Sequence, residues 1–453
     1  MTYEESVRYL LTLGTELASP QHARAVKFGL ENITRLAARM GEPQRAYRSV
    51  HIAGTNGKGS TAAMLDSILR AAGLRTGLYT SPHLERINER IRLDGAEISD
   101  ADFTAAFTRL RAVIEEMLAS GQLASHPTYF ECLTAMAFEV FGRASVDFAV
   151  FEVGLGGRLD ATNIIEPEVA VITQIDFDHE NYLGHSIEEI TAEKAGVIKP
   201  GASVVSAAAH PKAREVIARR STEQAARLVE VDSAYRVEDL SAREGGSEFT
   251  AVSVESGARL RIMVPLPGRY QARNALTALA AARVLAGRGV TLDDAAISRG
   301  IAATRWPGRL ERVSERPAIY LDGTHNPAGA RELAAFWDEH FAGRRIVLVY
   351  GAVRDKAVDE VAGLLFPRAD AVILTAARQP RAISAHALEE MVAHHAARCE
   401  TIPDPEAALD RAIELAGSDA IIFATGSLYL VGDLRGYWFA RRGKRPQDRI
   451  LRA

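Results

Sequence analysis

Apolar residues along the chain recur with two different spacings, and together these spacings predict an α/β fold. Runs that are almost continuously apolar and rich in valine and isoleucine lie at 146–153 and 169–175. Such runs are typical of central strands in a parallel sheet that helices cover on both faces. At 101–119 and 130–141, apolar residues instead recur with the spacing of an amphipathic helix. Strands that alternate with helices indicate a doubly wound sheet.

Shorter patterns add further elements to the first part of the chain. Strands are expected at 49–53, 75–80 and 201–206, and helices at 3–18, 29–40, 64–72 and 268–285. The runs 248–254 and 260–264 flank a polar, glycine-containing turn, which favours a β-hairpin.

The stretch Trp306-Pro307-Gly308-Arg309 breaks regular structure and separates two α/β patterns. After it, strand-like apolar runs lie at 318–321, 345–350, 369–375 and 420–424, with helical stretches between them. A chain of 453 residues is long enough for two or three domains. We therefore predict two domains, residues 1–303 and 304–453, joined by this stretch.

Composition narrows the class of protein. The hydrophobic fraction of 47% and charged fraction of 25% are ordinary for a globular protein, and a net charge of −4 offers no basic field to nucleic acid. Two distant cysteines, Cys132 and Cys399, argue against a disulfide framework. The chain shows no signal-peptide pattern and no apolar run of membrane-spanning length. We expect a cytoplasmic monomer with no nucleic-acid or membrane partner.

A glycine-rich turn between the strand at 49–53 and the helix at 64–72 predicts a phosphate site. Its glycines let backbone N–H groups converge on an anion at a helix N-terminus, and Lys58 adds a positive charge for outer phosphates. A hydroxyl at Ser60 or Thr61 could reach Mg²⁺. The turn departs from the common nucleotide loop at Ile52 and Gly59, so by itself it is equally consistent with an ordinary strand–helix turn.

Other polar residues follow the ends of predicted strands, where ligands of open α/β sheets bind. Ser81 follows the strand at 75–80, and the run 146–153 carries Glu152 near its end, before a cluster of glycines. Asp178 and His179 follow the run 169–175. We expect all of them at the same sheet edge as the phosphate loop.

Seven motifs occur in order along the chain: Gly54-Thr55-Asn56-Gly57-Lys58-Gly59-Ser60, Ser81-Pro82-His83-Leu84, Glu152-Val153-Gly154-Leu155-Gly156-Gly157-Arg158-Leu159-Asp160-Ala161-Thr162-Asn163, Asp178-His179, Glu193-Lys194-Ala195-Gly196, Trp306-Pro307-Gly308-Arg309-Leu310-Glu311 and Asp322-Gly323-Thr324-His325-Asn326-Pro327. With them the sequence resembles the folylpolyglutamate synthase and dihydrofolate synthase family of the wider Mur ligase superfamily. The resemblance covers nearly the whole chain.

The resemblance implies a fold and a reaction. Residues 1–303 would be a P-loop mononucleotide-binding ATPase domain, and residues 304–453 a Rossmann-like α/β domain that ligates glutamate. ATP would phosphorylate a substrate carboxylate, and the amine of L-glutamate would attack the resulting acyl phosphate. Such chemistry rests on positioning and on neutralising charge around the transferring phosphoryl group, with Mg²⁺ as cofactor.

The resemblance also assigns roles to individual residues. The expected ATP contacts are Thr55, Asn56, Gly57, Lys58, Gly59, Ser60, Asn274, Arg309 and Asp322, and the expected Mg²⁺ ligands are Ser81, Glu152 and His179. Oxygen donors suit Mg²⁺, whereas a histidine nitrogen is less usual, and taken alone His179 could equally be a hydrogen-bonding residue at a strand end. Lys58, Lys194 and His179 are the expected catalytic residues.

Lys194 matches a lysine that is carbamoylated in this superfamily, which would make it an N6-carboxylysine. Only a neutral amine attacks CO₂, and crowding or burial lowers the pKa of a lysine. The alternative is an unmodified lysine that binds phosphate.

Four functions remain to be weighed. The first is a bifunctional enzyme acting on dihydropteroate and reduced folates; the second is a folylpolyglutamate synthase alone. A cell-wall ligase would need a longer segment before the phosphate loop, and a catalytically dead scaffold would be expected to lack Lys58, Glu152 or His179. The residues that match the pterin site, and that favour the bifunctional enzyme, are Val26, Lys27, Phe28, Thr128, Phe130, Leu159, Asp160 and Ala161. An aromatic ring such as Phe130 can stack on a flat pterin, although core packing is its commoner role.

Overall fold

The apolar runs of the first part of the chain form an eight-stranded sheet. The computed structural model describes residues 1–14, 29–354 and 356–443. The strand order is β4-β3-β2-β5-β1-β6-β7-β8, parallel from β2 to β8 and antiparallel at β3 and β4. The strands are β1 (Arg48–Ala53), β2 (Thr76–Tyr79), β3 (Ile91–Leu93), β4 (Ala96–Glu97), β5 (Phe148–Glu152), β6 (Val169–Ile172), β7 (Ser203–Ser206) and β8 (Arg227–Glu230).

Helices cover both faces of this sheet, as the continuous apolar runs predict. Successive residues of a strand point to opposite faces. Phe148 and Val150 of β5 pack with the helices α4 (Lys58–Ala71), α11 (Tyr270–Gly287) and α12 (Asp294–Ala302). Ala149 and Phe151 pack on the other side, where the helices are α1 (Tyr3–Thr12), α3 (Glu31–Arg39), α5 (Asp100–Ala119) and α6 (Tyr129–Ala144). Further along that face lie α7 (Glu180–Leu183), α8 (Ile187–Ala195) and α9 (Pro211–Glu223).

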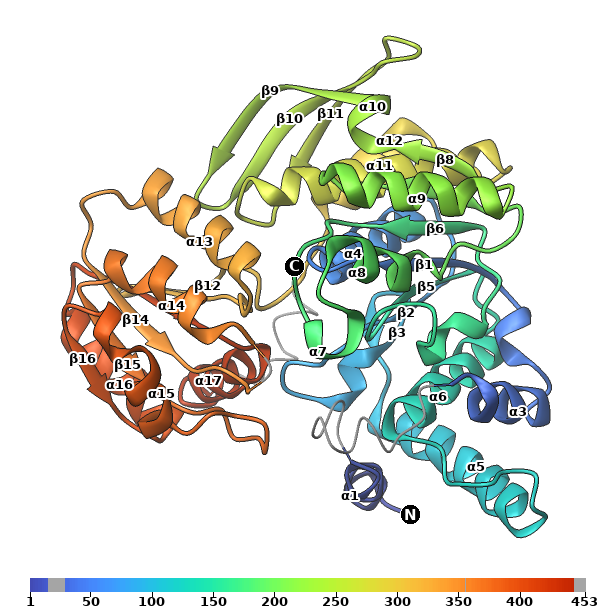
Figure 1. Ribbon diagram of the computed structural model, residues 1–453, viewed down its shortest axis with the longest axis horizontal. Coiled ribbons are helices and arrows are strands. Elements are labelled where there is room, and N and C mark those ends of the chain that lie inside the picture. Colours follow the sequence, from blue (N-terminus) through green and yellow to red (C-terminus); the bar gives the residue numbers. More distant parts are fainter. Residues whose placement is uncertain (15–28, 355, 444–453) are drawn as a thin grey trace.

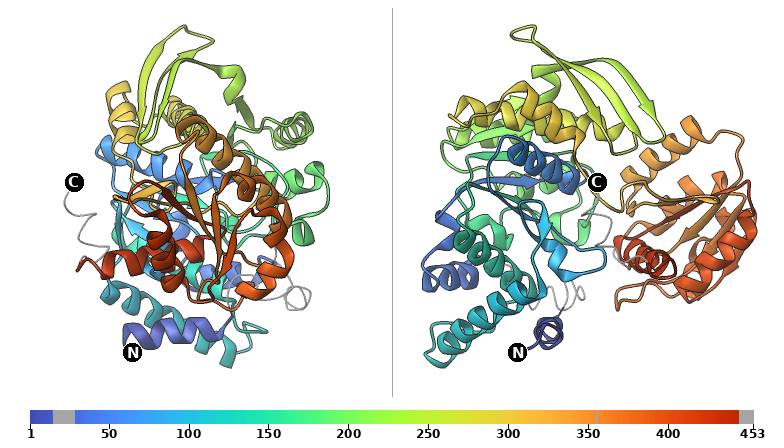
Figure 2. Two further views of the ribbon diagram at one scale, coloured as in Figure 1. Left: turned by 90° about the vertical axis from the view of Figure 1, so that its left-hand side faces the viewer. Right: turned by 180° about the vertical axis from the view of Figure 1, so that it is seen from behind.

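The predicted hairpin is part of a separate three-stranded antiparallel sheet. Its strands are β9 (Tyr235–Arg243), β10 (Gly246–Ser253) and β11 (Arg259–Val264), and α10 (Val231–Ala234) leads into it. Phe249 and Ile262 pack in the same core as α11 and α12. In Figures 1 and 2 this sheet lies at one end of the molecule and extends toward the C-terminal sheet. Glu244, in the β9–β10 turn, accepts a hydrogen bond from the hydroxyl of Tyr320.

The second α/β pattern forms a six-stranded sheet of order β12-β13-β17-β14-β15-β16. Its strands are β12 (Glu311–Glu315), β13 (Ala318–Leu321), β14 (Ile346–Tyr350), β15 (Ala371–Leu374), β16 (Cys399–Thr401) and β17 (Ile421–Thr425). All neighbours are parallel except β12 and β13. One face is covered by α13 (Pro327–His340), α14 (Val358–Leu365) and α15 (Ala385–Val392), and the other by α16 (Pro405–Ala416) and α17 (Leu428–Ala440).

Most of the expected strands and helices are confirmed, with shifts of a few residues at their ends. The expected helix at 3–18 ends as α1 at Thr12, and residues 15–18 lie outside the described part. The chain leaves the three-stranded antiparallel sheet after β11 and enters the six-stranded sheet at β12. Within the described ranges, none of the helices combines the length and the apolar character that a membrane span requires.

Candidate active site

The glycine-rich turn leads from the carboxyl end of β1 into the N-terminus of α4. Gly57, with a φ of +87°, immediately precedes the helix. A Cβ atom on Gly54 would lie 1.9 Å from Thr173 Oγ1, and one on Gly57 would lie 2.3 Å from Asn274 Oδ1. The turn therefore has no room for side chains at these two positions. Its backbone N–H groups and the helix N-terminus remain available to an anion.

Two lysines meet at this turn, of which Lys194 is buried and Lys58 is partly buried. Lys58 Nζ donates hydrogen bonds to the carbonyl oxygens of Gly54 (3.0 Å) and Thr55 (3.1 Å), and Lys194 Nζ donates to Gly54 as well (3.0 Å). Burial lowers the pKa of Lys58, partly offset by Glu152 and Asp178. Burial and the neighbouring Lys58 charge lower the pKa of Lys194 to about 7. Near neutral pH, a substantial fraction of Lys194 is therefore an uncharged amine.

The expected metal ligands come from three different strand ends. Glu152 ends β5 and is 5% exposed, and its Oε2 accepts a hydrogen bond from the Ser81 N–H at 3.2 Å. β2 and β5 are neighbours, so the structure brings these two residues together. His179 precedes α7, and its Nε2 lies 3.0 Å from Lys356 Nζ of the C-terminal part. In this arrangement Nε2 of His179 is bound to Lys356, and it could serve a metal only after Lys356 has moved.

Two residues of α11, Asn274 and Gln271, lie against the phosphate loop and the start of α4. Asn274 lies against Gly57, and its Nδ2 donates to Gln271 Oε1 at 2.9 Å, while Gln271 Nε2 donates to Ser60 Oγ at 3.3 Å. Gln271 was not predicted as a site residue, although the three-residue spacing places it on the same helix face as Asn274.

Asp322 and Arg309 are the two expected nucleotide contacts from the C-terminal part. Asp322 is hydrogen-bonded to the residue after Arg309, and Arg309 lies against the residue after Asp322. The carboxylate of Asp322 accepts the N–H of Leu310 (2.8 Å) and of Thr324 (2.9 Å). Arg309 Nη1 donates to the Gly308 carbonyl at 3.1 Å. A side chain on Gly323 would collide with the Arg309 guanidinium, because its Cβ would lie 2.5 Å from Nη1. Because Leu310 follows Arg309 directly, its hydrogen bond to Asp322 fixes the backbone that carries Arg309.

A network of polar contacts connects the phosphate loop with the start of α13. Asn56 and Asn326 exchange two amide hydrogen bonds of 3.2 and 3.0 Å, and Asn326 also donates to Asp178 at 3.2 Å. Lys356 Nζ lies 2.7 Å from Asp178 Oδ1. Burial tends to raise the pKa of Asp178, but Lys356, His325 and His179 more than offset this, and the pKa lies well below its usual range. Asn326 was part of a recognised motif, but its contact with the loop was not predicted.

A pocket of about 340 Å³ opens beside this network. Its lining includes Arg354, Lys356, His179 and Asn326, the residue that caps the N-terminus of α13. Cationic side chains and a helix N-terminus both favour negatively charged ligands. Asp178, Glu180 and Glu360 also line the pocket, so it offers charges of both signs and suits a molecule that carries carboxylates together with an amine.

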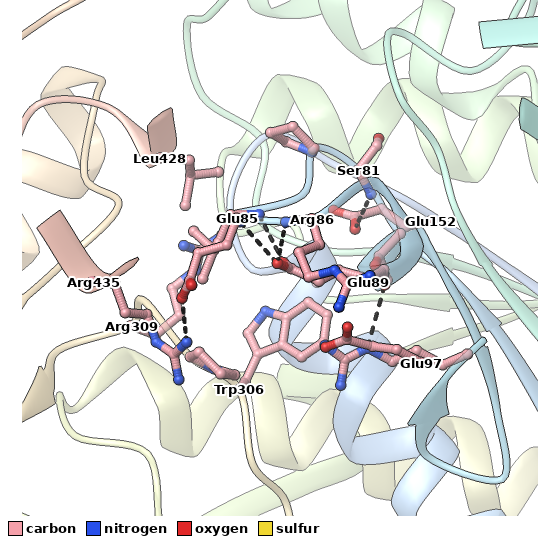
Figure 3. A pocket seen from close by; sticks show the side chains of 16 residues that line it. Ser81, Glu85, Arg86, Glu89, Glu97, Glu152, Trp306, Arg309, Leu428 and Arg435 are labelled. Carbon is pink, nitrogen blue, oxygen red and sulfur yellow. Dashed lines mark hydrogen bonds and ion pairs between the residues drawn. The ribbon is translucent and has the colours of Figure 1, made fainter. Parts of the chain in front are cut away.

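Figure 3 shows a second, smaller pocket of about 60 Å³ next to Ser81 and Glu152. The carboxylate of Glu89 accepts the backbone N–H groups of Leu84, Glu85 and Arg86 at 2.7–2.8 Å, which fixes the loop that follows Ser81. Arg435 of α17 reaches this loop from the C-terminal part and forms ion pairs with Glu85 and Glu311. The C-terminal part is thus anchored on the loop that carries a predicted metal ligand.

A tight contact in this anchor leads to a prediction. A Cβ on Gly432 of α17 would lie 1.9 Å from the backbone oxygen of Leu84, which cannot move aside as a side chain can. Gly432→Ala should force α17 from the loop and lower kcat about 10-fold or more, because small misplacements near reacting groups are costly. Gly436→Ala on the same helix is the control, since its Cβ would meet its nearest neighbour, Glu85 Oε2, at an ordinary 3.4 Å. Steady-state rates equal for both variants would contradict the prediction.

Of the residues expected to bind the pterin, Phe130 and Asp160 lie close together, both beside Gly154. The ring of Phe130 lies against Gly154, where a Cβ would be 2.6 Å from Cζ of the ring and 3.2 Å from Asp160 Oδ2. Asp160 accepts N–H groups from Leu155 (2.9 Å) and Thr162 (3.0 Å), and burial raises its pKa. Much of its hydrogen-bonding capacity therefore serves its own loop.

The other residues expected to bind the pterin lie on different elements and differ in burial. Thr128 caps the N-terminus of α6, Leu159 is half-buried, and Ala161 is buried at the start of the short 3₁₀ helix η3 (Ala161–Ile164). Val26, Lys27 and Phe28 lie outside the described residues.

The chain is similar to known proteins over most of its length. Residues 52–282 match the family model of the Mur ligase middle domain, and residues 308–428 that of the Mur ligase glutamate ligase domain. A Bacillus subtilis protein named dihydrofolate synthase/folylpolyglutamate synthase is 38% identical over 414 residues, which is 90% of this chain and 95% of that protein. An Escherichia coli protein of the same name is 33% identical over 93% of this chain and 94% of that protein.

Solved structures show the same similarity. A Mycobacterium tuberculosis folylpolyglutamate synthase complexed with ADP and AMPPCP has a TM-score of 0.85 and 37% identity, covering 96% of this chain and 99% of that one. An Escherichia coli structure in complex with DHPP and ADP has a TM-score of 0.84 and 31% identity, covering 98% of this chain and 99% of that one.

Proposed function

The chain belongs to the folylpolyglutamate synthase and dihydrofolate synthase family of the Mur ligases, and on this premise we propose that it is the bifunctional enzyme. It joins L-glutamate to dihydropteroate and to reduced folates, in an ADP-forming reaction. The observation that carries the function is the convergence of the phosphate loop, Lys58, Lys194 and Glu152 at the carboxyl edge of one parallel sheet.

The first half of the reaction takes place at this loop. The N–H groups of residues 55–60 and the Lys58 ammonium hold the phosphates of ATP and neutralise charge on the transferring group. Ser81 and Glu152 would hold Mg²⁺, which supplies further positive charge there, and His179 would join them once Lys356 has moved from its Nε2. The hydroxyl and carboxylate oxygens fit this ion. The substrate carboxylate takes the phosphoryl group and becomes an acyl phosphate, while ADP leaves.

The second half requires an amine close to the acyl phosphate. We assign L-glutamate to the 340 Å³ pocket, because Arg354, Lys356 and the N-terminus of α13 suit its carboxylates. The amine then attacks the acyl carbonyl, and phosphate leaves as the amide forms. The hydrogen bonds between Asn56 and Asn326 keep the phosphate loop and this pocket side by side.

Three further proposals complete this function. The domain division falls between residues 303 and 304, supported by the change of sheet between β11 and β12. Mg²⁺ is the cofactor, supported by the oxygen donors at Ser81 and Glu152. The enzyme acts in the cytoplasm as a monomer; the two cysteines, which the structure leaves free, fit a reducing compartment.

One assay separates the bifunctional enzyme from a folylpolyglutamate synthase alone. Purified protein is given ATP, L-glutamate and either dihydropteroate or tetrahydrofolate, and phosphate release is followed together with the glutamylated product. We expect turnover with both substrates. Turnover with tetrahydrofolate alone would leave only the second activity, and turnover with neither would refute the proposal.

The pterin contact gives a second prediction. Phe130→Ala should raise KM for dihydropteroate about 10-fold and leave KM for ATP unchanged, because a stacking face worth about 0.5–1.5 kcal/mol is lost together with buried area. Phe103→Ala is the control, since this ring is buried in the same apolar cluster on α5. It should lower the melting temperature without changing either KM. Equal effects of both variants on KM for dihydropteroate would argue for core packing.

A further inference from the structure

Two histidines and an aspartate converge on the surface of the C-terminal part, away from the ligase site. Asp359 lies in the first turn of α14, and His394 and His395 end the 3₁₀ helix η5 (Ala393–His395), which follows α15. The ligand atoms of the three side chains all lie within 4.8 Å of one another. Nε2 of His395 is 2.8 Å from Asp359 Oδ1, and Nε2 of His394 is 3.8 Å from the same oxygen.

The His395 ring has a defined position between its neighbour His394 and helix α14. The two imidazole rings lie over each other, with centroids 4.0 Å apart and an angle of 39° between their planes. Gly363 is one helical turn after Asp359 on the same face of α14. A Cβ there would lie 3.5 Å from Cε1 of His395, so the His395 ring rests against the helix at a position without a side chain. Only 24% of the His395 side chain is exposed, whereas His394 and Asp359 are open to solvent.

We propose that Asp359, His394 and His395 bind a divalent transition-metal ion of the Zn²⁺ class. Imidazole nitrogens select Zn²⁺, Cu²⁺ or Ni²⁺ over Mg²⁺, which prefers oxygen. Ligands at about 2.0–2.2 Å from a tetrahedral Zn²⁺ lie roughly 3.3 Å from one another, close to the two nitrogen–oxygen distances here. Two nitrogens and one oxygen leave the fourth position to water. A bound ion would fasten α14 to η5.

This site is chemically distinct from the proposed Mg²⁺ site, so its test does not depend on the ligase function. Metal-free, full-length protein is titrated with ZnCl₂ by calorimetry in an excess of Mg²⁺, which keeps the oxygen-rich site from taking the probe. Asp359→Asn, His394→Ala and His395→Ala are compared with the wild type. His386→Ala is the matched control, an exposed histidine of the neighbouring α15 whose Nδ1 is 3.6 Å from Glu389.

We expect one Zn²⁺ per chain and a melting temperature that rises on Zn²⁺ addition, because the ion binds the folded state alone. Each of the three ligand variants should weaken Zn²⁺ binding at least about 10-fold and abolish the rise, whereas His386→Ala should change neither. Without metal, Asp359→Asn and His394→Ala should melt as the wild type does, because both side chains are exposed. With Cu²⁺ as the probe, the electron paramagnetic resonance spectrum should show coupling to two nitrogens. Wild-type affinity in the three ligand variants, or an equal loss in His386→Ala, would overturn the proposal.

Discussion

Lys194→Ala should abolish ligation, with kcat lowered about 10³-fold, while the protein remains folded. The pKa of Lys194 is lowered to about 7 by burial and by Lys58. At pH 8 most of the group is therefore the neutral amine that CO₂ requires, and the carbamate that forms is an anion beside the phosphate loop. The alanine variant leaves a cavity, and acetate, a short carboxylate, should restore part of the rate.

The activity of the enzyme should also depend on CO₂ and on pH. Wild-type enzyme kept in CO₂-free buffer at pH 6 should lose activity and regain it with bicarbonate at pH 8, because protonation below pH 7 removes the reactive amine. Lys199→Ala is the control: this lysine is half-buried and donates to the Asn163 carbonyl at 2.8 Å, away from the loop. It should keep most of the activity and show the same response to bicarbonate. A fully active Lys194→Ala enzyme, or a wild type indifferent to CO₂, would exclude the carbamate.

Burial of Lys194 also affects stability. Its pKa in the folded state lies below the value of 10.5 for an unperturbed lysine. Between about pH 7 and pH 10.5 the unfolded chain binds the proton and the folded chain does not, so the contribution of Lys194 to the free energy of unfolding rises with pH in this window. Below pH 7 the charged, buried ammonium destabilises the fold. Lys194→Met should therefore be inactive and yet melt no lower than the wild type at pH 6.

Glu152→Gln should preserve the fold and lower kcat about 10²–10³-fold. Glutamine keeps the size of the side chain and an oxygen that accepts the Ser81 N–H, but it removes the negative charge that would hold Mg²⁺. The apparent Mg²⁺ requirement, measured from phosphate release across a Mg²⁺ series, should rise together with the loss of kcat.

Glu168→Gln is a matched control for Glu152→Gln. Glu168 immediately precedes β6 and pairs with Arg48 at the start of β1, so it lies at the opposite edge of the same sheet. It should affect the melting temperature alone. If Glu152→Gln unfolded, with unchanged activity per folded molecule, Glu152 would be structural.

The sequence predicted the central strands well because burial on both faces makes them continuously apolar. β5 and β6 are buried at every residue. The missed strands are short or lie at sheet edges. β9 alternates half-buried with exposed residues and includes several charged side chains, and β16 has three half-buried residues, so neither has a continuous apolar run.

At the site, the sequence indicated residue types and strand ends but not contacts across the molecule. The bonds between Asn56 and Asn326 and between Lys356 and His179 join residues more than 170 positions apart. They depend on how the two α/β parts pack against each other, and the pattern of apolar and polar residues within one segment does not predict that packing. The residue types likewise did not indicate that the Asp160 carboxylate accepts hydrogen bonds from backbone N–H groups of its own loop.

The position of Trp306 gives this protein an internal optical signal. Its indole packs against the phosphate loop, where a Cβ on Gly59 would lie 3.0 Å from Nε1, and the Arg92 guanidinium carbon is 5.5 Å from its ring. The other two tryptophans of the sequence, Trp337 and Trp438, are buried on opposite faces of the C-terminal sheet. A nucleotide that enters the loop changes the surroundings of one indole and leaves the other two as a constant background. Intrinsic fluorescence should therefore follow nucleotide binding in the unlabelled protein, and Trp306→Phe should remove the signal.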